Sequence, residues 1–261
     1  MRTNEFKAAL KQGKKQIGIW VSNPDALNAE IVAGAGFDWA LCDMEHAPNS
    51  YAEVSRQLQA FVGSRTTPLV RPIWNDPLHV KQLMDLGSPG VLFPMVQTVE
   101  EAQAAVAATR YPPKGIRGAA GIVRATNFGR DTGYKAEVEA ETCILIQLES
   151  QSALSLAEDI AAVDGVDGIF FGPADISADM GHGGNPAVPA VWEAIMPVAK
   201  ALMAKGVPVG TLTLNPKQAK ELMAQGFSFV ACGMDNALLA RAADALLADM
   251  QASLQSGFQA T

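Results

Sequence analysis

The residues with the clearest chemical potential follow an apolar run in the segment WALCDMEHAP. Asp43, Glu45 and His46 lie within four residues of one another, directly after Trp39–Cys42. A surface loop would account for the charges, but not for the apolar residues that lead straight into them. The alternative to a functional role is that Asp43 simply caps a turn. The crowding of Glu45 and His46 at the same point favours a functional site.

Polar residues also follow three later apolar runs. Residues two apart on a strand share a face, so Gln147 and Glu149 point the same way, as do Asp43 and Glu45. Asp175 follows the next strand along the chain, so we expect Glu149 and Asp175 to meet. The polar or close-approach residues at these three strand ends are Arg71, Gln147, Glu149, Gly172, Ala174 and Asp175.

Two carboxylates that meet in this way have two common uses. They can share a proton as an acid–base pair. They can instead share a divalent cation, which prefers carboxylate and water oxygens. Arg71 nearby would bind a substrate carboxylate in a bidentate manner. A cation and an arginine acting on one anion would suit a 2-oxo acid, with Arg71 stabilising the charge of an enolate.

Eight strand–helix units surround these residues and predict a (β/α)8 barrel. The predicted strands are continuous apolar runs, as expected when both faces of a parallel sheet are covered. Such a barrel brings the carboxyl ends of all its strands to one rim, where the polar residues would gather. A doubly wound open sheet is the alternative, but VSNPDA after the first strand lacks its glycine-rich turn. The predicted strands are 16–21, 39–45, 67–72, 90–96, 142–149, 168–172, 207–214 and 227–234.

The segments between the strands predict helices and two long loops. A short helix precedes the first strand, and a terminal helix with a broad apolar face is expected over 236–255. Long loops are expected from Tyr111 to about Gly133 and after the sixth strand. No linker interrupts the pattern, so we expect one domain over 1–261. The other predicted helices are a first one ending near Gly34 and Gly36, then 51–62, 77–86, 98–110, 152–163, 189–205 and 216–225.

Lysine placement separates two kinds of carbanion chemistry. An aldolase that works through a Schiff base needs a lysine at the catalytic end of a strand. Every lysine lies in a predicted helix, in a loop or, like Lys205, just before a strand. Carbanion chemistry at this rim would therefore need a metal.

Composition narrows the class of protein further. The net charge of −7 leaves no basic field for nucleic acid. No apolar window is long enough for a membrane span, and the first residues contain no signal peptide. Cys42, Cys143 and Cys232 lie far apart in apolar runs, which indicates free thiols in a reducing compartment. We expect a cytoplasmic protein that acts on small molecules.

The motifs resemble those of the metal-dependent, class II pyruvate aldolases of the HpcH/HpaI family. The resemblance spans about residues 16 to 235, and the motifs are specific only in combination. They are CDMEHAP, PLVRP, LMDLGSPGVLFPMV, YPPKGIRG, QLES and FGPADISADMG. The resemblance implies reversible cleavage of 4-hydroxy-2-oxo acids, such as 4-hydroxy-2-oxoheptanedioate, to pyruvate and an aldehyde through a metal-bound pyruvate enolate.

The resemblance also implies roles for individual residues. Glu149 and Asp175 would bind the metal (Mg, Mn or Co), and Arg71 would bind the oxo acid. His46, paired with Asp43, would act as an acid–base dyad through a water. Gln147, Gly172 and Ala174 would contact pyruvate, and Asp85 would reach the aldehyde site of a neighbouring subunit. The resemblance also implies a homohexamer (trimer of dimers) in which the C-terminal helix is exchanged between subunits.

Several readings stay open at this point. An oxaloacetate decarboxylase would use the same half-reaction, and a non-catalytic metabolite-binding barrel would use the same fold. His182 lies in a loop at the rim, as a substrate contact or a solvated residue. Arg117 and Arg124 are interpreted as solvated loop residues, with substrate binding as the alternative. His79 is interpreted as a surface or packing residue.

Overall fold

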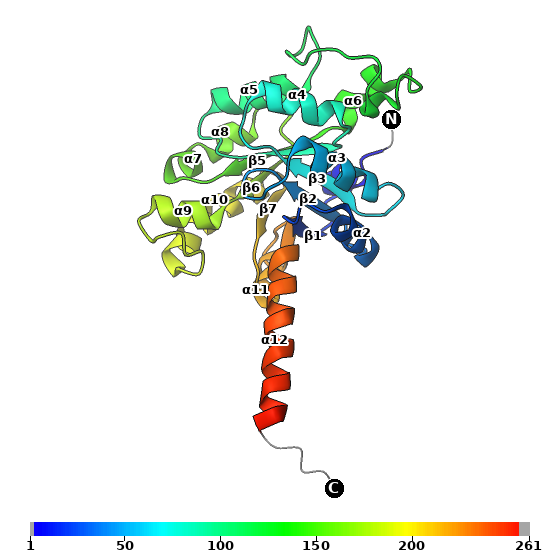
Figure 1. The fold of residues 1–261 in the computed structure, drawn as a ribbon. Coiled ribbons are helices and arrows are strands. Elements are labelled where there is room, and N and C mark those ends of the chain that lie inside the picture. The colour runs from blue at the N-terminus through cyan, green and yellow to red at the C-terminus, as the bar shows by residue number, and fades with distance from the viewer. Residues whose placement is uncertain (1–2, 256–261) are drawn as a thin grey trace.

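Eight parallel strands close into a barrel in the computed structural model, which describes residues 3–255 (Figure 1). The strands pair in sequence order, and β1 (Gln16–Val21) pairs with β8 (Phe229–Met234) to complete the ring. The predicted (β/α)8 barrel is therefore confirmed, and closure of the sheet rules out the open alternative. The single-domain expectation over 1–261 stays a prediction.

Most strands are shorter than predicted, and in β2, β3 and β5 the residues that leave the sheet at the carboxyl end belong to the rim. Strand β2, for example, ends at Asp43, and Glu45 lies in the loop that follows. The remaining strands are β2 (Trp39–Asp43), β3 (Thr67–Arg71), β4 (Gly90–Phe93), β5 (Cys143–Leu148), β6 (Gly168–Phe171) and β7 (Val209–Leu212).

The helices follow the prediction with several differences, among them the short 3-10 helix η1 within the first predicted loop. The predicted helix 152–163 is broken at Leu156 into two short helices. Helices α6 and α9 replace predicted loop, since each is short and buries too few residues for a clear sequence period. The helices are α1 (Glu5–Lys11), α2 (Ala26–Ala35), α3 (Tyr51–Ala60), α4 (Pro77–Asp85), α5 (Val99–Thr109), η1 (Arg124–Thr126), α6 (Tyr134–Glu141), α7 (Gln151–Ser155), α8 (Ala157–Ala161), α9 (Pro173–Asp179), α10 (Pro189–Ala204), α11 (Pro216–Ala224) and α12 (Asp235–Gln255).

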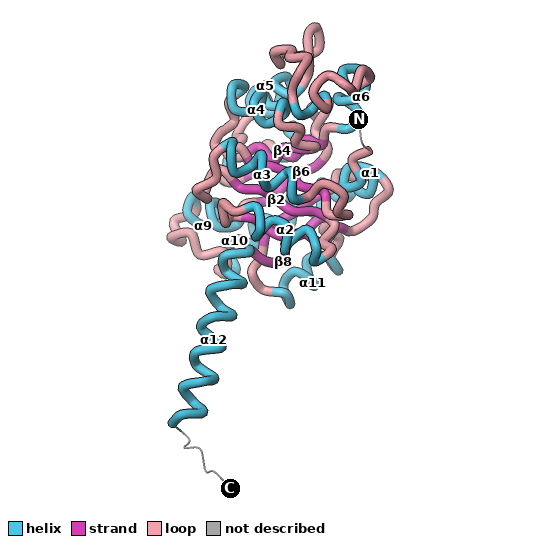
Figure 2. Tube along the Cα trace, turned by 45° about the vertical axis from the view of Figure 1, so that its right-hand side comes forward, coloured by secondary structure: helices cyan, strands magenta, loops and turns pink. Residues whose placement is uncertain are grey.

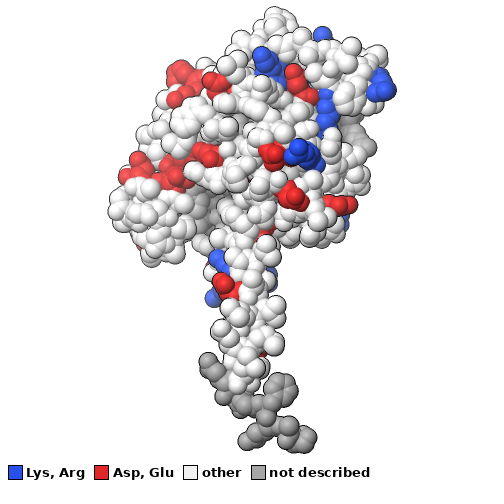
Figure 3. Space-filling view, viewed as in Figure 1, with Lys and Arg blue, Asp and Glu red and all other residues white. Residues whose placement is uncertain are grey.

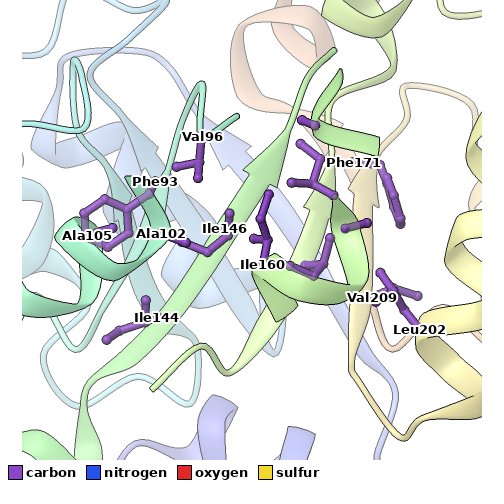
Figure 4. Close-up of a cluster of buried hydrophobic side chains, with 14 of the residues drawn as sticks. Phe93, Val96, Ala102, Ala105, Ile144, Ile146, Ile160, Phe171, Leu202 and Val209 are labelled. Carbon is purple, nitrogen blue, oxygen red and sulfur yellow. The ribbon is translucent and has the colours of Figure 1, made fainter. Parts of the chain in front are cut away.

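Apolar side chains fill the barrel and the space between barrel and helices. The largest outer cluster includes Phe93, Ile146 and Phe171, which pack under the surrounding helices (Figure 4). Inside the barrel, the ring of Phe6 from α1 lies 5.6 Å from that of Trp39. It lies 5.7 Å from that of Phe229. Because these partners lie at or near the starts of their strands, α1 closes the amino-terminal end of the barrel and leaves the opposite end for chemistry.

Helix α12 extends away from the barrel as a single rod (Figures 1 and 2). Its direction is set at its first residue, where the buried Asp235 carboxylate accepts hydrogen bonds from the Ser22 and Asn23 backbone N–H groups (2.9 and 3.1 Å). The visible face of the helix carries few charged atoms (Figure 3). Its leucines and methionine are more than half exposed: Leu238, Leu239, Leu246, Leu247, Met250 and Leu254.

Within residues 3–255, no helix combines the length and the apolar character needed to cross a bilayer. The three cysteines are free thiols, as predicted, and burial raises the pKa of Cys42 well above its ordinary value.

Candidate active site at the carboxyl end of the barrel

A buried ion pair between neighbouring strands forms one side of the site. Asp43 and Arg71 are register partners at the ends of β2 and β3. Arg71 donates from Nε and Nη2 to the two oxygens of Asp43, each at 2.8 Å. The Asp43 carboxylate also accepts from the indole N–H of Trp20 (3.2 Å) and the backbone N–H of Glu45 (3.1 Å). Four donors therefore fix this carboxylate in place.

The electrostatics agree with a fixed, charged Asp43. Burial by itself would raise the pKa of the Asp43 carboxyl. The hydrogen bonds and charge of Arg71 outweigh burial, so that pKa lies below its usual value. The guanidinium of Arg71 also lies over the Trp20 ring, 5.0 Å from its centroid. Asp43 is thus an anion that orients Arg71 toward the mouth of the barrel.

The loop after β2 places Glu45 and His46 beside this pair. Glu45 Oε2 lies 2.7 Å from Arg71 Nη1 and 3.8 Å from His46 Nε2. The His46 side chain is 67% exposed, so it is open to solvent and substrate. Within residues 3–255, no ion pair or hydrogen bond joins Asp43 to His46. The expected pairing of Asp43 with His46 is therefore not found. Asp43 pairs with Arg71 instead, and Glu45 is the carboxylate beside the His46 imidazole.

A second carboxylate, Glu149, is held on the other side of the mouth. It follows β5 and is almost completely buried. Gln147 Nε2 donates to its Oε1 (2.5 Å), and the backbone N–H of Met95 donates to its Oε2 (2.6 Å). Met95 has a φ of 53°, a left-handed conformation that is strained for this residue type. The strained backbone at Met95 directs its N–H at Glu149.

Gly172 allows the Glu149 side chain to lie against the end of β6. A Cβ atom at residue 172 would lie 2.8 Å from Glu149 Cγ and 3.0 Å from Oε1. Asp175 then enters from the first turn of α9, where it is half-buried. Burial, together with the charges of Glu45 and Asp175, raises the pKa of the Glu149 carboxyl to about 8. The structure therefore brings Glu149 and Asp175 into one electrostatic site, with Ala174 exposed between Gly172 and Asp175.

The residues at the mouth fit a divalent cation. Gln147 Oε1 is buried and has no hydrogen-bond partner among the described residues. Burial and the neighbouring carboxylates raise the pKa of Glu149 even though the charge of Arg71 lowers it, so a bound cation would stabilise the ionised carboxylate. No cluster of three or more His, Cys, Asp or Glu residues within 3–255 could hold a metal. A cation at Glu149 and Asp175 would therefore complete its shell with water and substrate oxygens.

The lysines support the same interpretation. Lys7 is the one lysine classed as buried in the described part of the chain. Its Nζ bonds the Thr142 carbonyl and Asp167 at the amino-terminal end of the barrel, away from Arg71. A Schiff-base lysine at the mouth is thus not found among residues 3–255.

Asp85 lies outside this cluster. It is the last residue of α4, and a helix between parallel strands runs back toward their amino-terminal end. Asp85 instead pairs with Arg117 at 2.9 Å. Arg117 is buried against Tyr111 and Tyr134, so its interpretation as a solvated loop residue is wrong.

The other rim and loop residues occupy varied positions. Arg124 donates to the Leu86 and Leu58 carbonyls at the ends of α4 and α3 (2.6 and 3.1 Å), so it too is not a solvated residue. His182 is exposed. His79 is half-buried against Tyr51, which agrees with a packing histidine. Trp20 and Met95 were not predicted to act in the site.

The model of one protein family matches residues 16–242, which include every residue of the barrel mouth. The chain belongs to the HpcH/HpaI aldolase/citrate lyase family. A member from Salmonella arizonae, named 4-hydroxy-2-oxo-heptane-1,7-dioate aldolase, is 50% identical over 94% of each chain. An Escherichia coli protein of the same name is 48% identical over 94% of each chain.

A solved structure of an HpcH/HpaI family protein from Burkholderia cenocepacia has the same fold. Its TM-score is 0.92 at 35% identity, and the match covers 95% of this chain and 100% of the other. As a member of the HpcH/HpaI family, the chain is an enzyme of the lyase class. This assignment decides against the non-catalytic barrel.

Proposed function

We propose that the chain reversibly cleaves 4-hydroxy-2-oxo acids to pyruvate and an aldehyde, with a divalent cation (Mg, Mn or Co). The observation that carries the proposal is that the buried Glu149 carboxylate lies within electrostatic reach of both Asp175 and Arg71. The names of the relatives that match nearly the whole chain support the substrate class, and 4-hydroxy-2-oxoheptanedioate is the first substrate to test.

Glu149 and Asp175 would hold the cation. When bound, it would polarise the carbonyl of the oxo acid and stabilise negative charge on its oxygen. Gln147, with its unpartnered Oε1, and the close approach permitted at Gly172 would shape the pyruvate site next to Ala174. The metal stays open, because carboxylate and water ligands accept all three ions.

Arg71 would bind the anionic oxygens of the substrate. Asp43 accepts from Arg71 Nε and from one hydrogen of Arg71 Nη2. The second Nη2 hydrogen and Nη1, which faces Glu45, are the donors that substrate oxygens could take. In cleavage, the C4 hydroxyl loses a proton and C4 becomes the aldehyde carbonyl as the C3–C4 bond breaks. The electrons of that bond form the C2–C3 double bond of the enolate, and the C2 carbonyl electrons move to the C2 oxygen. Arg71 would stabilise that oxygen as its negative charge develops.

His46 would move the protons of the reaction. Its exposed imidazole can accept the hydroxyl proton through a water and return a proton to C3 of the pyruvate product. Asp43 supports this step indirectly, since it fixes Arg71 beside the loop that carries His46.

Assembly would complete the aldehyde site. Asp85, at the end of the barrel opposite to Arg71 and partly exposed, would reach the aldehyde in a neighbouring subunit. The uncovered apolar face of α12 supports exchange of this helix in a homohexamer, a trimer of dimers. The free thiols support a cytoplasmic enzyme.

The test combines bond cleavage with proton exchange. With Mg²⁺, the protein should exchange the methyl protons of pyruvate for solvent deuterium and cleave 4-hydroxy-2-oxoheptanedioate, and a chelator should abolish both. Arg71→Ala should depress both, whereas His46→Ala should retain metal and lose rate by roughly 10²–10⁴-fold. A lysine adduct trapped by borohydride with pyruvate would contradict the proposal. Product analysis with oxaloacetate separates the decarboxylase alternative.

A further inference from the structure

Glu45 makes a contact that the proposed reaction does not use. Its Oε2 atom lies 2.7 Å from Arg71 Nη1, and the side chain is only 10% exposed. The same oxygen has no aligned hydrogen bond to any described residue. Glu45 is therefore held at Arg71 by charge alone, at one of the donors that would otherwise face a ligand.

The two carboxylates that flank Arg71 are held very differently. Asp43 is fixed by hydrogen bonds from Arg71, Trp20 and the Glu45 backbone. The Glu45 side chain sits on a loop outside the sheet, and its contacts with Arg71 and His46 among the described residues are ion pairs. An incoming anion can therefore displace Glu45 from Arg71 far more easily than it can displace Asp43.

The charge balance of the mouth points the same way. Burial raises the pKa of the Glu45 carboxyl, and the charges of Asp43 and Asp175 add to this, although Arg71 and His46 oppose it. An ionised Glu45 next to these carboxylates is thus an unfavourable group that a substrate oxygen can replace. His46 is the other basic side chain in contact with Glu45 among the described residues, and its Nε2 lies 3.8 Å from the same Oε2 atom.

We propose that Glu45 occupies, in the substrate-free enzyme, the donor of Arg71 that an anionic oxygen of the 2-oxo acid takes, and that binding releases Glu45 to His46. Glu45 then lowers substrate affinity, because each binding event must break its ion pair. It also assists turnover, because the released carboxylate stabilises the protonated imidazole. This inference rests on the proposed function.

Glu45→Gln separates the two effects. Oxalate, a non-reacting planar dianion, serves as the probe in the Mg²⁺-loaded protein. Calorimetry should show that Glu45→Gln binds oxalate at least about threefold more tightly than the wild-type protein does. The KM for pyruvate in deuterium exchange should fall in parallel, and kcat should fall as well. Glu45→Ala, a smaller side chain, should show the same split.

Two controls isolate the contact with Arg71. Asp179→Asn removes a carboxylate at the same end of the barrel, where Asp179 bonds the Gln151 backbone and not Arg71. Its oxalate affinity should stay at the wild-type value. In an Arg71→Ala background, Glu45→Gln should give no gain.

The outcomes are distinct. Unchanged or weaker oxalate binding in Glu45→Gln, or an equal gain in Asp179→Asn, would overturn the competition. Tighter binding with unchanged kcat would overturn the transfer to His46. If the wild-type protein neither exchanges pyruvate protons nor cleaves the oxo acid, the proposed function itself has failed.

Discussion

At the scale of single residues, Glu149 links metal binding to pH. Burial, together with the charges of Glu45 and Asp175, raises the pKa of its carboxyl from 4.5 to about 8. A cation must displace this proton, so metal affinity should rise with pH up to about 8, by roughly tenfold per pH unit below it. Calorimetry at pH 7 in buffers of different ionisation enthalpy should detect release of about one proton.

The same proton affects the metal-free fold in the opposite direction. The folded pKa lies above the unfolded value, so folding binds a proton between these values, and this stabilising contribution is lost as pH rises through about 8. Glu149→Gln should remove both the proton release and this slope. Metal affinity that is flat from pH 6 to 8 in the wild-type protein would contradict the assignment.

The partners of Asp43 show where sequence reasoning stops at this scale. The positions of Asp43 and Arg71 at the ends of predicted strands placed both at the rim, and the structure makes them register partners. The choice between Arg71 and His46 as partner depends on loop geometry over a few ångströms, which residue spacing does not specify. Met95 is a clearer case, because nothing in its residue type signals a left-handed backbone.

At the scale of elements, Gly172 tests how closely β5 and β6 must approach. Gly172→Ala should leave the barrel folded, with a modest loss of stability of about 1–3 kcal/mol from overpacking. Metal affinity should fall more clearly, because the new methyl group displaces the Glu149 carboxylate. Thermal unfolding and Mn²⁺ calorimetry measure the two effects.

Gly34→Ala in α2 is the matched control. A Cβ at residue 34 meets no atom within 4 Å, so both quantities should stay near the wild-type values or improve slightly. Wild-type metal affinity in Gly172→Ala would mean that the Glu149 side chain moves without loss of its role.

The elements themselves were largely predictable, and the exceptions have a common cause. Continuous apolar runs predict the strands of a parallel sheet that is covered on both faces. Helices α6 and α9 were missed because each is short, so neither fills enough turns for a period to show. The sequence predicted that Asp175 lies at the rim, but it predicted a loop where the structure has α9.

At the scale of the whole molecule, α12 is the element that we expect to govern the proposed association. Covering an exposed leucine contributes about 1.5–3 kcal/mol, and several lie on this helix. Leu239→Gln with Leu246→Gln should therefore yield a smaller particle in sedimentation velocity, with an unchanged barrel by circular dichroism. Asp244→Asn, an exposed polar change on the same helix, should sediment like the wild-type protein. A wild-type protein that sediments as a fully active monomer would contradict shared sites.

The position of α12 after the barrel has a consequence for synthesis in the cell. All eight strands precede α12 in the chain, so the last of them leaves the ribosome before the helix does. The barrel can therefore close on its own during translation, while the apolar stripe of α12 is still uncovered. If the proposed homohexamer forms, each new subunit would pass through an interval in which its barrel is folded but α12 has not yet packed on a neighbour. That interval, which shortens as subunit concentration rises, is when chaperones and proteases would compete with a partner for the helix.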